Sequence, residues 1–477
     1  MDSRSAESLT WTPAHTLIAV VLCGAQVLDG IDVTMVNVAL PAIARQVGVS
    51  EAALSWVVSA YMVTFGGFLL LGGRAGDLIG RRTVFLAGLV LFAVGSLASG
   101  LAREPGVLVG ARAVQGVAAA LIAPMTLALL AANFPAGKPR DRAFALWAAA
   151  YAVSSALGLL LGGLLVNALG WRSIFFVNVP IAAGILVVAL RYLRPDRPAR
   201  SHHRFDVAGA VTSTAGVGLL AFGVLSGRTD GWSGSGTVVA LAVAGLLLAY
   251  FAVHETRLAS EPLVRFSLLR ERSVAGANIV TALRGAAMFA LFYFATLYQQ
   301  QVLGFSPLKT AAAYLPLTLI LLVASGAGPA LVRRIGIRVV LPAGSLIAAA
   351  GLVWFAQLTR DGSLLWSVVA PSAVVAVGFA IMVVPSTIAA VTGVPAAHTG
   401  IASALLNVSL QVGGALGLAA LSTLADSEGT RLEGFSAAFV AAAALMAATA
   451  IVAVLLFRDE GRGAEVDVMA LQKAGLE

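Results

Sequence analysis

The chain has 477 residues, of which 59% are apolar and only 11% are charged. Soluble domains have about 45–50% apolar and about 25% charged residues, so this composition, with a mean hydropathy of +0.93, excludes a soluble protein and predicts an integral membrane protein. The net charge is +8, and the single cysteine, Cys23, excludes an intramolecular disulfide.

The first apolar segment, roughly residues 16–40, is long enough to span a bilayer, and no cleavable signal peptide precedes it. It carries two carboxylates, Asp29 and Asp32. A charge at the bilayer centre costs about 2.5–3.5 kcal/mol on insertion scales, so such residues usually face a cavity or a partner. The spacing of three places both acids on one helix face, where they cannot both ionise cheaply. The pair is predicted to be a proton site, and a polar pair that serves only packing is the alternative.

No other acid lies well inside an apolar segment, because Asp77 and Asp206 stand at segment ends and the rest lie in loops or tails. A proton-coupled carboxylate is therefore expected to be Asp29 or Asp32. In the fourth apolar segment, Arg112 is the expected partner of these acids, and a helix brace bound to backbone carbonyls is its alternative role.

The second apolar segment runs into a glycine- and arginine-rich stretch, residues 72–82, which we expect to be a short polar loop with a tight turn. Charged contacts there would form a conformational latch at the cytoplasmic ends of the spans. A plain turn that only carries a topology signal is the alternative. The expected latch residues are Gly73, Arg74, Asp77, Gly80, Arg81 and Arg82.

The fifth apolar segment carries Gly158, Gly162 and Gly163 at small-xxx-small spacing, which predicts close approach of a neighbouring helix. Two later segments, about 207–226 and 237–254, lack polar groups that would line a pathway. The ninth segment, about 273–297, contains Arg284 at a depth similar to that of Asp29. We expect Arg284 to face the acids across a central cavity, where it competes with protons or binds an anionic substrate group. Snorkelling or carbonyl bonding without a transport role is its alternative.

Fourteen apolar segments are predicted, centred near residues 28, 64, 92, 120, 152, 182, 216, 245, 285, 319, 348, 379, 412 and 446. The last six resemble the first six, since Pro124 has a counterpart in Pro385 and Gly162 in Gly413. Such repeats are how many secondary transporters are built. The predicted division is a six-span bundle (1–193), a basic loop with two inserted spans (194–256), a second six-span bundle (257–457) and a tail (458–477).

The basic charge follows this topology. Of the 31 Lys and Arg residues, 22 fall on the side of both termini and 7 on the other side. This is the positive-inside pattern with both termini cytoplasmic. Basic residues distributed in this way reflect membrane topology and do not indicate a nucleic-acid-binding surface, so no nucleic-acid partner is expected.

Polar and aromatic side chains within the spans are candidates for the wall of a substrate cavity, although each could equally be packing or helix glue. They are Asn37, Gln115, Tyr293, Gln299, Asn407 and Gln411, in addition to Arg284. The five histidines show no metal spacing, no phosphate-binding loop occurs and no nucleophile–His–acid set is found. We expect no metal, no cofactor and no enzymatic activity.

Several motifs resemble those of the major facilitator superfamily, in particular its fourteen-span drug:proton antiporters. Residues 73–82 resemble the loop between spans two and three, and 112–116 resemble the span-four signature. Residues 32–41, 171–180 and 407–417 resemble segments of the fourteen-span exporters. The chain departs twice: Leu159 follows Gly158 where the exporters have proline, and Asp29 is additional to the family's acidic position, which Asp32 occupies.

The resemblance implies an all-α transporter of two six-helix bundles and a two-helix insert in the bacterial cytoplasmic membrane. It would export hydrophobic or amphipathic drugs in exchange for protons, with the proton gradient as its energy source and no obligatory protein partner. A carrier of another substrate class, such as an organic anion, sugar or metabolite, is the first alternative. A membrane receptor is the second, but it predicts a soluble signalling domain, and the segment after Phe457 has only about twenty residues.

Overall fold

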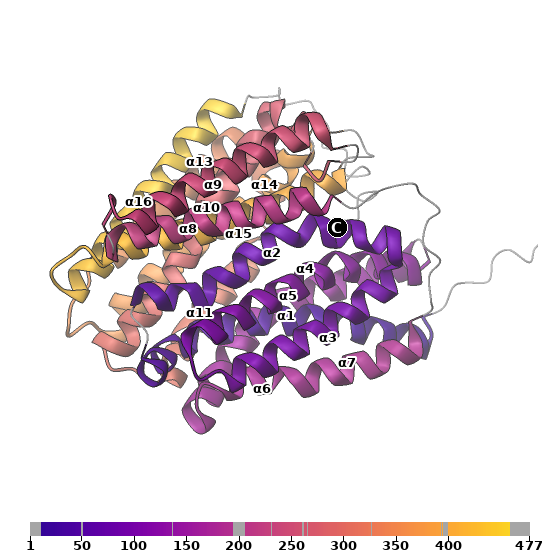
Figure 1. Ribbon diagram of the computed structural model, residues 1–477, viewed down its shortest axis with the longest axis horizontal. Coiled ribbons are helices and arrows are strands. Elements are labelled where there is room, and N and C mark those ends of the chain that lie inside the picture. The colour runs from indigo at the N-terminus through magenta and orange to yellow at the C-terminus, as the bar shows by residue number, and fades with distance from the viewer. Residues whose placement is uncertain are drawn as a thin grey trace, which may run out of the picture.

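In a computed structural model of the chain, every regular element of the described residues is a helix (Figure 1). The structure describes residues 11–48, 51–135, 137–193, 206–229, 231–259, 262–264, 266–325, 327–392, 394 and 399–457. The predicted tail and most of the basic loop after residue 193 lie outside these ranges.

Seven helices precede the insert, and the sixth and seventh are separated only by Val177. They are α1 (Pro13–Val47), α2 (Glu51–Ile79), α3 (Arg81–Leu101), α4 (Pro105–Asn133), α5 (Lys138–Leu169), α6 (Ser173–Phe176) and α7 (Asn178–Tyr192). The insert consists of α8 (Val207–Thr229), α9 (Ser235–Val253) and the π-helix η1 (His254–Leu258), which continues α9 directly.

The remaining elements form the second half of the chain. They are the 3₁₀ helix η2 (Leu268–Arg270), α10 (Arg272–Leu297), the π-helix η3 (Tyr298–Val302), α11 (Pro307–Ser325), α12 (Gly328–Ile335), α13 (Ile337–Phe355), the π-helix η4 (Leu365–Val369), α14 (Ala370–Val391), α15 (Thr399–Ala425) and α16 (Arg431–Leu456).

The predicted fourteen spans agree with the structure. Thirteen of the described helical segments are long and apolar enough to cross a membrane, and the apolar part of α5, Val153–Leu169, supplies a shorter fourteenth. Helix α5 is longer than its apolar part because its first turns carry Lys138, Arg140 and Arg142. The chain is therefore a multi-pass membrane protein.

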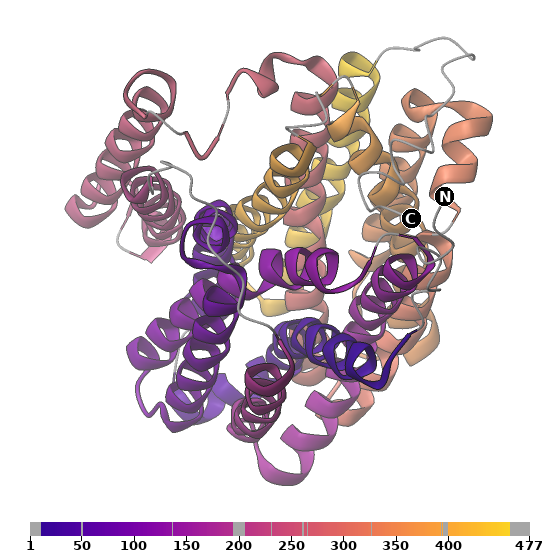
Figure 2. The ribbon, with the colours of Figure 1, turned by 90° about the vertical axis from the view of Figure 1, so that its right-hand side faces the viewer.

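Helices α8 and α9 form a hairpin on the outside of the bundle (Figure 2). They pack on each other, and α8 also packs on α2 and α15. Only 17% of the α9 span is buried inside the protein, against 72% of the α10 span. A mostly exposed apolar helix suits a lipid-facing position.

The stretch expected as a polar loop over residues 72–82 is mostly helical. Helix α2 continues to Ile79, and only Gly80 separates it from α3. Gly80 has a φ of +97°, a value that glycine adopts at no steric cost. The expected tight turn is thus a single residue, and the loop prediction was wrong for the residues before it.

Helix α5 packs closely on α1 through Gly158 and Gly162. A Cβ on Gly158 would stand 2.8 Å from Ile31 Cα, and one on Gly162 would stand 2.9 Å from Met35 Cα. Both atoms belong to the main chain of α1, so no side-chain rotation could make room. Small residues at this spacing let two backbones approach.

The same packing recurs between α15 and α10 in the second half. A Cβ on Gly413 would stand 2.5 Å from Ala282 Cα, and one on Gly417 would stand 2.6 Å from Ala286 Cα. In each half, two glycines spaced four residues apart on one helix thus contact two residues that are also spaced four apart on the neighbouring helix. This agrees with the internal repeat read from the sequence.

The two halves meet through α2 with α15 and through α5 with α11. A Cβ on Gly163 would lie 2.7 Å from Ala311 Cβ of α11. Gln411 of α15 lies over Gly66 of α2, at 3.1 Å by the same measure. The third glycine of α5 therefore belongs to the contact between halves, whereas Gly158 and Gly162 belong to the first half.

Candidate functional site

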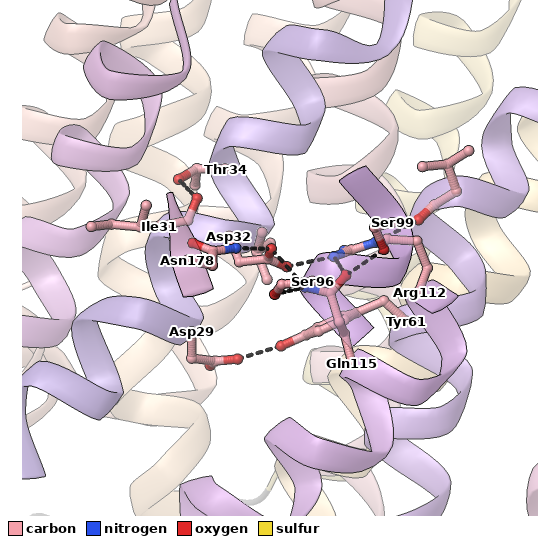
Figure 3. A network of polar contacts seen from close by, with 12 residues as sticks. Asp29, Ile31, Asp32, Thr34, Tyr61, Ser96, Ser99, Arg112, Gln115 and Asn178 are labelled. Atoms are coloured by element: carbon pink, nitrogen blue, oxygen red, sulfur yellow. Dashed lines mark hydrogen bonds and ion pairs between the residues drawn. The ribbon is translucent and has the colours of Figure 1, made fainter. Parts of the chain in front are cut away.

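Asp32 lies at the centre of a buried polar network in the first half (Figure 3). Its side chain is fully buried, and three side chains from two other helices donate to it. Arg112 donates to Oδ2 at 2.5 Å, Gln115 donates to Oδ1 at 3.0 Å and Asn178 donates to Oδ1 at 2.7 Å. The number of donors around a buried carboxylate controls whether it holds a charge or a proton.

Arg112 is held from several directions and is only 1% exposed. Besides Asp32, its guanidinium donates to the Gln115 Oε1 at 3.0 Å and to the Val57 carbonyl at 3.1 Å, and it lies over the Tyr61 ring at 4.6 Å. Both roles weighed for Arg112 are therefore present, as ion-pair partner and as a brace on a backbone carbonyl. Two buried charges are tolerated only when their remaining donors and acceptors are satisfied in this way.

Gln115 connects the ion pair to α3. Its amide group donates to Ser96 Oγ at 2.8 Å, and Ser99 donates to its carbonyl oxygen at 3.2 Å. Gly95 makes this approach possible, because a Cβ there would lie 2.8 Å from Gln115 Cγ. Gln115, which the sequence suggested as a cavity residue, is thus a fully buried hydrogen-bond donor to Asp32.

The close packing of α4 on α2 brings Arg112 to its backbone acceptor. A Cβ on Gly116 would lie 2.4 Å from the Tyr61 carbonyl oxygen. Thr64 of α2 also donates to the Ala113 carbonyl of α4 at 2.9 Å. The span-four residues 112–116 therefore include the two side chains that donate to Asp32 and the glycine that lets α4 approach α2.

Asp29 has a different partner from Asp32. The Tyr61 hydroxyl donates to Asp29 Oδ1 (Figure 3), and Asp29 is only half-buried. Of the two acids, the Arg112 guanidinium donates its hydrogen bond to Asp32. The structure therefore separates the two acids into one bound by a cation and one bound by a phenol.

The expected latch residues surround the junction of α2 and α3. Arg82 donates to the Leu190 carbonyl of α7 at 2.9 Å. Gly73 lies beside Pro124 of α4, as Gly328 lies beside the corresponding Pro385 in the second half. Arg74 and Arg81 stand on either side of Gly80, and the side chain of Asp77 is outside the described residues. A latch function of this set stays a prediction.

The other cavity candidates come from α1, α10, η3 and α15. Asn37 is buried and donates to the Val33 carbonyl of its own helix at 3.0 Å, as a packing residue does. Tyr293 and Gln299 are buried near the end of α10, whereas on α15 Gln411 is buried and Asn407 is exposed. Their role in a substrate cavity stays a prediction.

Arg284 is buried within α10, with 8% of its surface exposed. It lies on α10 between Ala282 and Ala286, the residues that Gly413 and Gly417 of α15 contact. The depth similar to that of Asp29 that the sequence suggests stays a prediction. That Arg284 faces the acids across a central cavity also stays a prediction.

Sequence reasoning missed four members of the network: Asn178, Ser96, Ser99 and Tyr61. Asn178 lies within residues 171–180, a segment already identified as typical of exporters, and that signal could have found it. Ser96, Ser99 and Tyr61 had no local signal, because serine and tyrosine in apolar helices are common packing residues.

Known proteins match most of the length of the chain. The family model of the Major Facilitator Superfamily matches residues 22–418. The cephamycin export protein CmcT of Amycolatopsis lactamdurans is 37% identical over 452 residues, which cover 93% of each chain. The puromycin resistance protein pur8 of Streptomyces alboniger is 37% identical over 409 residues, 85% of this chain and 80% of pur8.

Solved structures have the same fold at low identity. The POT family transporter PepTSo superposes with a TM-score of 0.69 at 16% identity, covering 94% of this chain and 98% of that one. The nucleoside transporter NupG gives 0.66 at 10% identity. The family match over residues 22–418 and the relatives at 37% identity show that the chain belongs to the major facilitator superfamily.

Proposed function

We propose that the protein exports hydrophobic or amphipathic drugs across the cytoplasmic membrane in exchange for protons. The observation that carries the proposal is the fully buried carboxylate of Asp32, bound by Arg112, Gln115 and Asn178. An acid inside a membrane span marks a functional site by default. Relatives at 37% identity that are named for cephamycin export and puromycin resistance support the choice of substrate class.

Proton exchange at Asp32 follows from its donors. While Arg112 and the two amides contact the carboxylate, its charge is compensated and no proton is needed. A conformation that withdraws these donors leaves a buried charge that must be neutralised, and a proton neutralises it. A substrate that binds only one of the conformations then shifts the equilibrium and couples its own movement to that of the proton.

Other residues have supporting roles in this proposal. Residues 73–82 act as a latch between conformations, through contacts such as that of Arg82 with α7. Arg284 acts from the second half, either in competition with protons for the acids or as a binding group for an anionic part of the substrate. Arg284→Ala and Arg284→Gln with unchanged drug resistance and proton exchange would remove Arg284 from the mechanism.

We place the protein in a bacterial cytoplasmic membrane with both termini in the cytoplasm, because basic residues are concentrated on the side of the termini. We retain the division into bundles 1–193 and 257–457 with an insert between them. A small-molecule substrate, protons and the lipid bilayer are the partners this function requires.

The test uses inverted membrane vesicles that contain the wild type, Asp32→Asn or Asp29→Asn, with puromycin as the first probe compound. Substrate-induced proton release is expected in the wild type and lost in Asp32→Asn, whereas Asp29→Asn changes only its pH dependence. Asp361→Asn, which changes an exposed acid, is the matched control. Wild-type exchange in Asp32→Asn vesicles would overturn the assignment of the proton site.

Substrate range is tested separately in a strain that lacks its own drug pumps. A panel of hydrophobic cations and neutral antibiotics should show raised resistance with the wild type and sensitivity with Asp32→Asn. If no compound in the panel is exported while proton exchange responds to sugars or organic anions, the protein is a carrier of another class.

A further inference from the structure

Two buried carboxyl groups face each other at the base of the inserted hairpin. Asp206 directly precedes α8, and Glu255 lies in η1 at the end of α9, so the two ends of the insert bring them together. Asp206 is 8% exposed and Glu255 is 5% exposed. The sequence places both acids at segment ends, Asp206 just before the segment at about 207–226 and Glu255 just after the one at about 237–254.

One oxygen of each carboxyl group is satisfied by a conventional donor. Asp206 Oδ1 accepts from the Gly209 amide at 2.7 Å and contacts His254 Nε2 at 2.8 Å. Glu255 Oε2 accepts from the Val264 amide at 2.9 Å. These contacts fix the orientation of both groups.

The second oxygen of each group is directed to the same small space. A Cβ on Gly209 would lie 2.5 Å from Glu255 Oε1 and 2.7 Å from Asp206 Oδ2. Within the described residues, both oxygens are buried and neither has an N–H or O–H donor. Two carboxylate oxygens held together without a donor repel each other, whereas one shared proton turns the contact into a hydrogen bond.

The surroundings leave few other sources of compensation. Among the residues that the structure describes, His254 is the titratable side chain that faces the two acids, and it contacts the satisfied oxygen of Asp206. The elements packed around the pair present apolar side chains, including Phe68 of α2 and Leu405 of α15. Burial raises the pKa of Asp206, but the Gly209 amide and the His254 and Glu255 side chains outweigh it, so that this pKa is lowered. Asp206 has two partners, the Gly209 amide and His254, whereas Glu255 has only the Val264 amide, so the better-compensated Asp206 is assigned the charge and Glu255 the proton.

We propose that Asp206 and Glu255 form a second proton-binding site, separate from the one in α1, which ties the base of the insert to the segment leading into α10. The tie is physical, because Glu255 binds the Val264 amide and Val264 packs with Leu405 of α15. Loss of the proton places two like charges in contact and weakens this attachment. The insert thereby acquires a pH-dependent link to α2 and α15, the helices that join the two halves.

A direct test is the infrared C=O stretch of a protonated carboxylic acid in the purified full-length protein. The difference spectrum between wild type and Glu255→Gln at mildly acidic pH should contain one such band, which shifts in D₂O. Glu433→Gln, which changes an exposed glutamate, should give no band. Identical spectra for wild type and Glu255→Gln would overturn the proposal.

A second measurement does not depend on the folding of the Glu255 variant. In Asp29→Asn/Asp32→Asn, both span-one acids are removed while Asp206 and Glu255 remain, so a protonated-acid band should persist. Its disappearance in that variant would place every protonated acid in α1 and would refute the second site. Substrate-driven proton release separates the two proposals, because it should survive Glu255→Gln even if it is lost in Asp32→Asn.

The shared proton should also make the stability of the folded protein depend on pH. The shared proton is bound in the folded state, so the stability it supplies is present at acid pH and lost as the pH rises past the release of that proton. The thermal midpoint of the wild type should fall over this range, and Glu255→Gln, whose amide can donate to Asp206 at any pH, should lack this fall. An equal fall in both proteins would contradict the attachment role.

Discussion

A double-mutant cycle on Arg112 and Asp32 gives the sharpest measure of the central ion pair. Removal of one partner from a buried ion pair typically costs about 3–5 kcal/mol, because the remaining charge is left without compensation. Arg112→Gln leaves Asp32 with its donors Gln115 and Asn178, so we expect a loss near the lower end, about 3 kcal/mol. Asp32→Asn leaves Arg112 with the neutral acceptors Val57 O and Gln115 Oε1 and should cost a similar amount.

The double variant leaves neither charge of this ion pair, so its loss should be smaller than the sum of the single losses. Close charge pairs show coupling energies of about 1.5–7 kcal/mol in such cycles. We expect at least about 1.5 kcal/mol here, measured as the free energy of unfolding in mixed lipid–detergent micelles titrated with dodecyl sulfate and followed by circular dichroism.

The control cycle combines Arg112→Gln with Asp361→Asn, which is exposed in the second half. Its single effects should add within about 0.5 kcal/mol. Additivity to the same degree in the Arg112–Asp32 cycle would show that the two groups are not an energetic pair, and the site built on their contact would fail.

Three further predictions concern the packing of α5 and the hydrogen bond of Asp29. Gly158→Ala should destabilise the protein by about 1–3 kcal/mol, the usual cost of overpacking, because its Cβ would meet the main chain of α1, whereas Gly184→Ala, with open space around it, should be neutral in the same unfolding assay. Gly163→Ala should instead change transport rate more than stability, since its contact lies between the halves. Tyr61→Phe removes the hydroxyl that donates to Asp29 and should alter the pH dependence of proton release, as is expected for Asp29→Asn. A profile identical to wild type would show that this hydrogen bond has no part in exchange.

The sequence predicted several residues of the site but few of the contacts between them. Asp32, Arg112 and Gln115 were each visible because a charge or an amide is unusual inside an apolar segment. Their mutual bonds were not, because the donors to Asp32 come from α4 and α7, and the distance between helices is set by packing. Asn178 illustrates this: its motif was recognised, but only the break after α6 and the position of α7 aim its amide at Asp32.

The sequence by itself determined the class of protein, the fourteen spans and the repeat of six. These are properties of composition and periodicity, which act within a segment of about twenty residues. It also located the glycines at which helices approach, since their spacing is local.

Only the tertiary structure decided how the acids are partnered. Spacing and hydropathy alone do not separate Asp29 from Asp32, yet one meets a tyrosine from α2 and the other an arginine from α4. Asp206 and Glu255 are 49 positions apart at segment ends, where burial cannot be read from local hydropathy. The closing of the α8–α9 hairpin brings them together, because burial and charge compensation depend on neighbours that are distant in the chain.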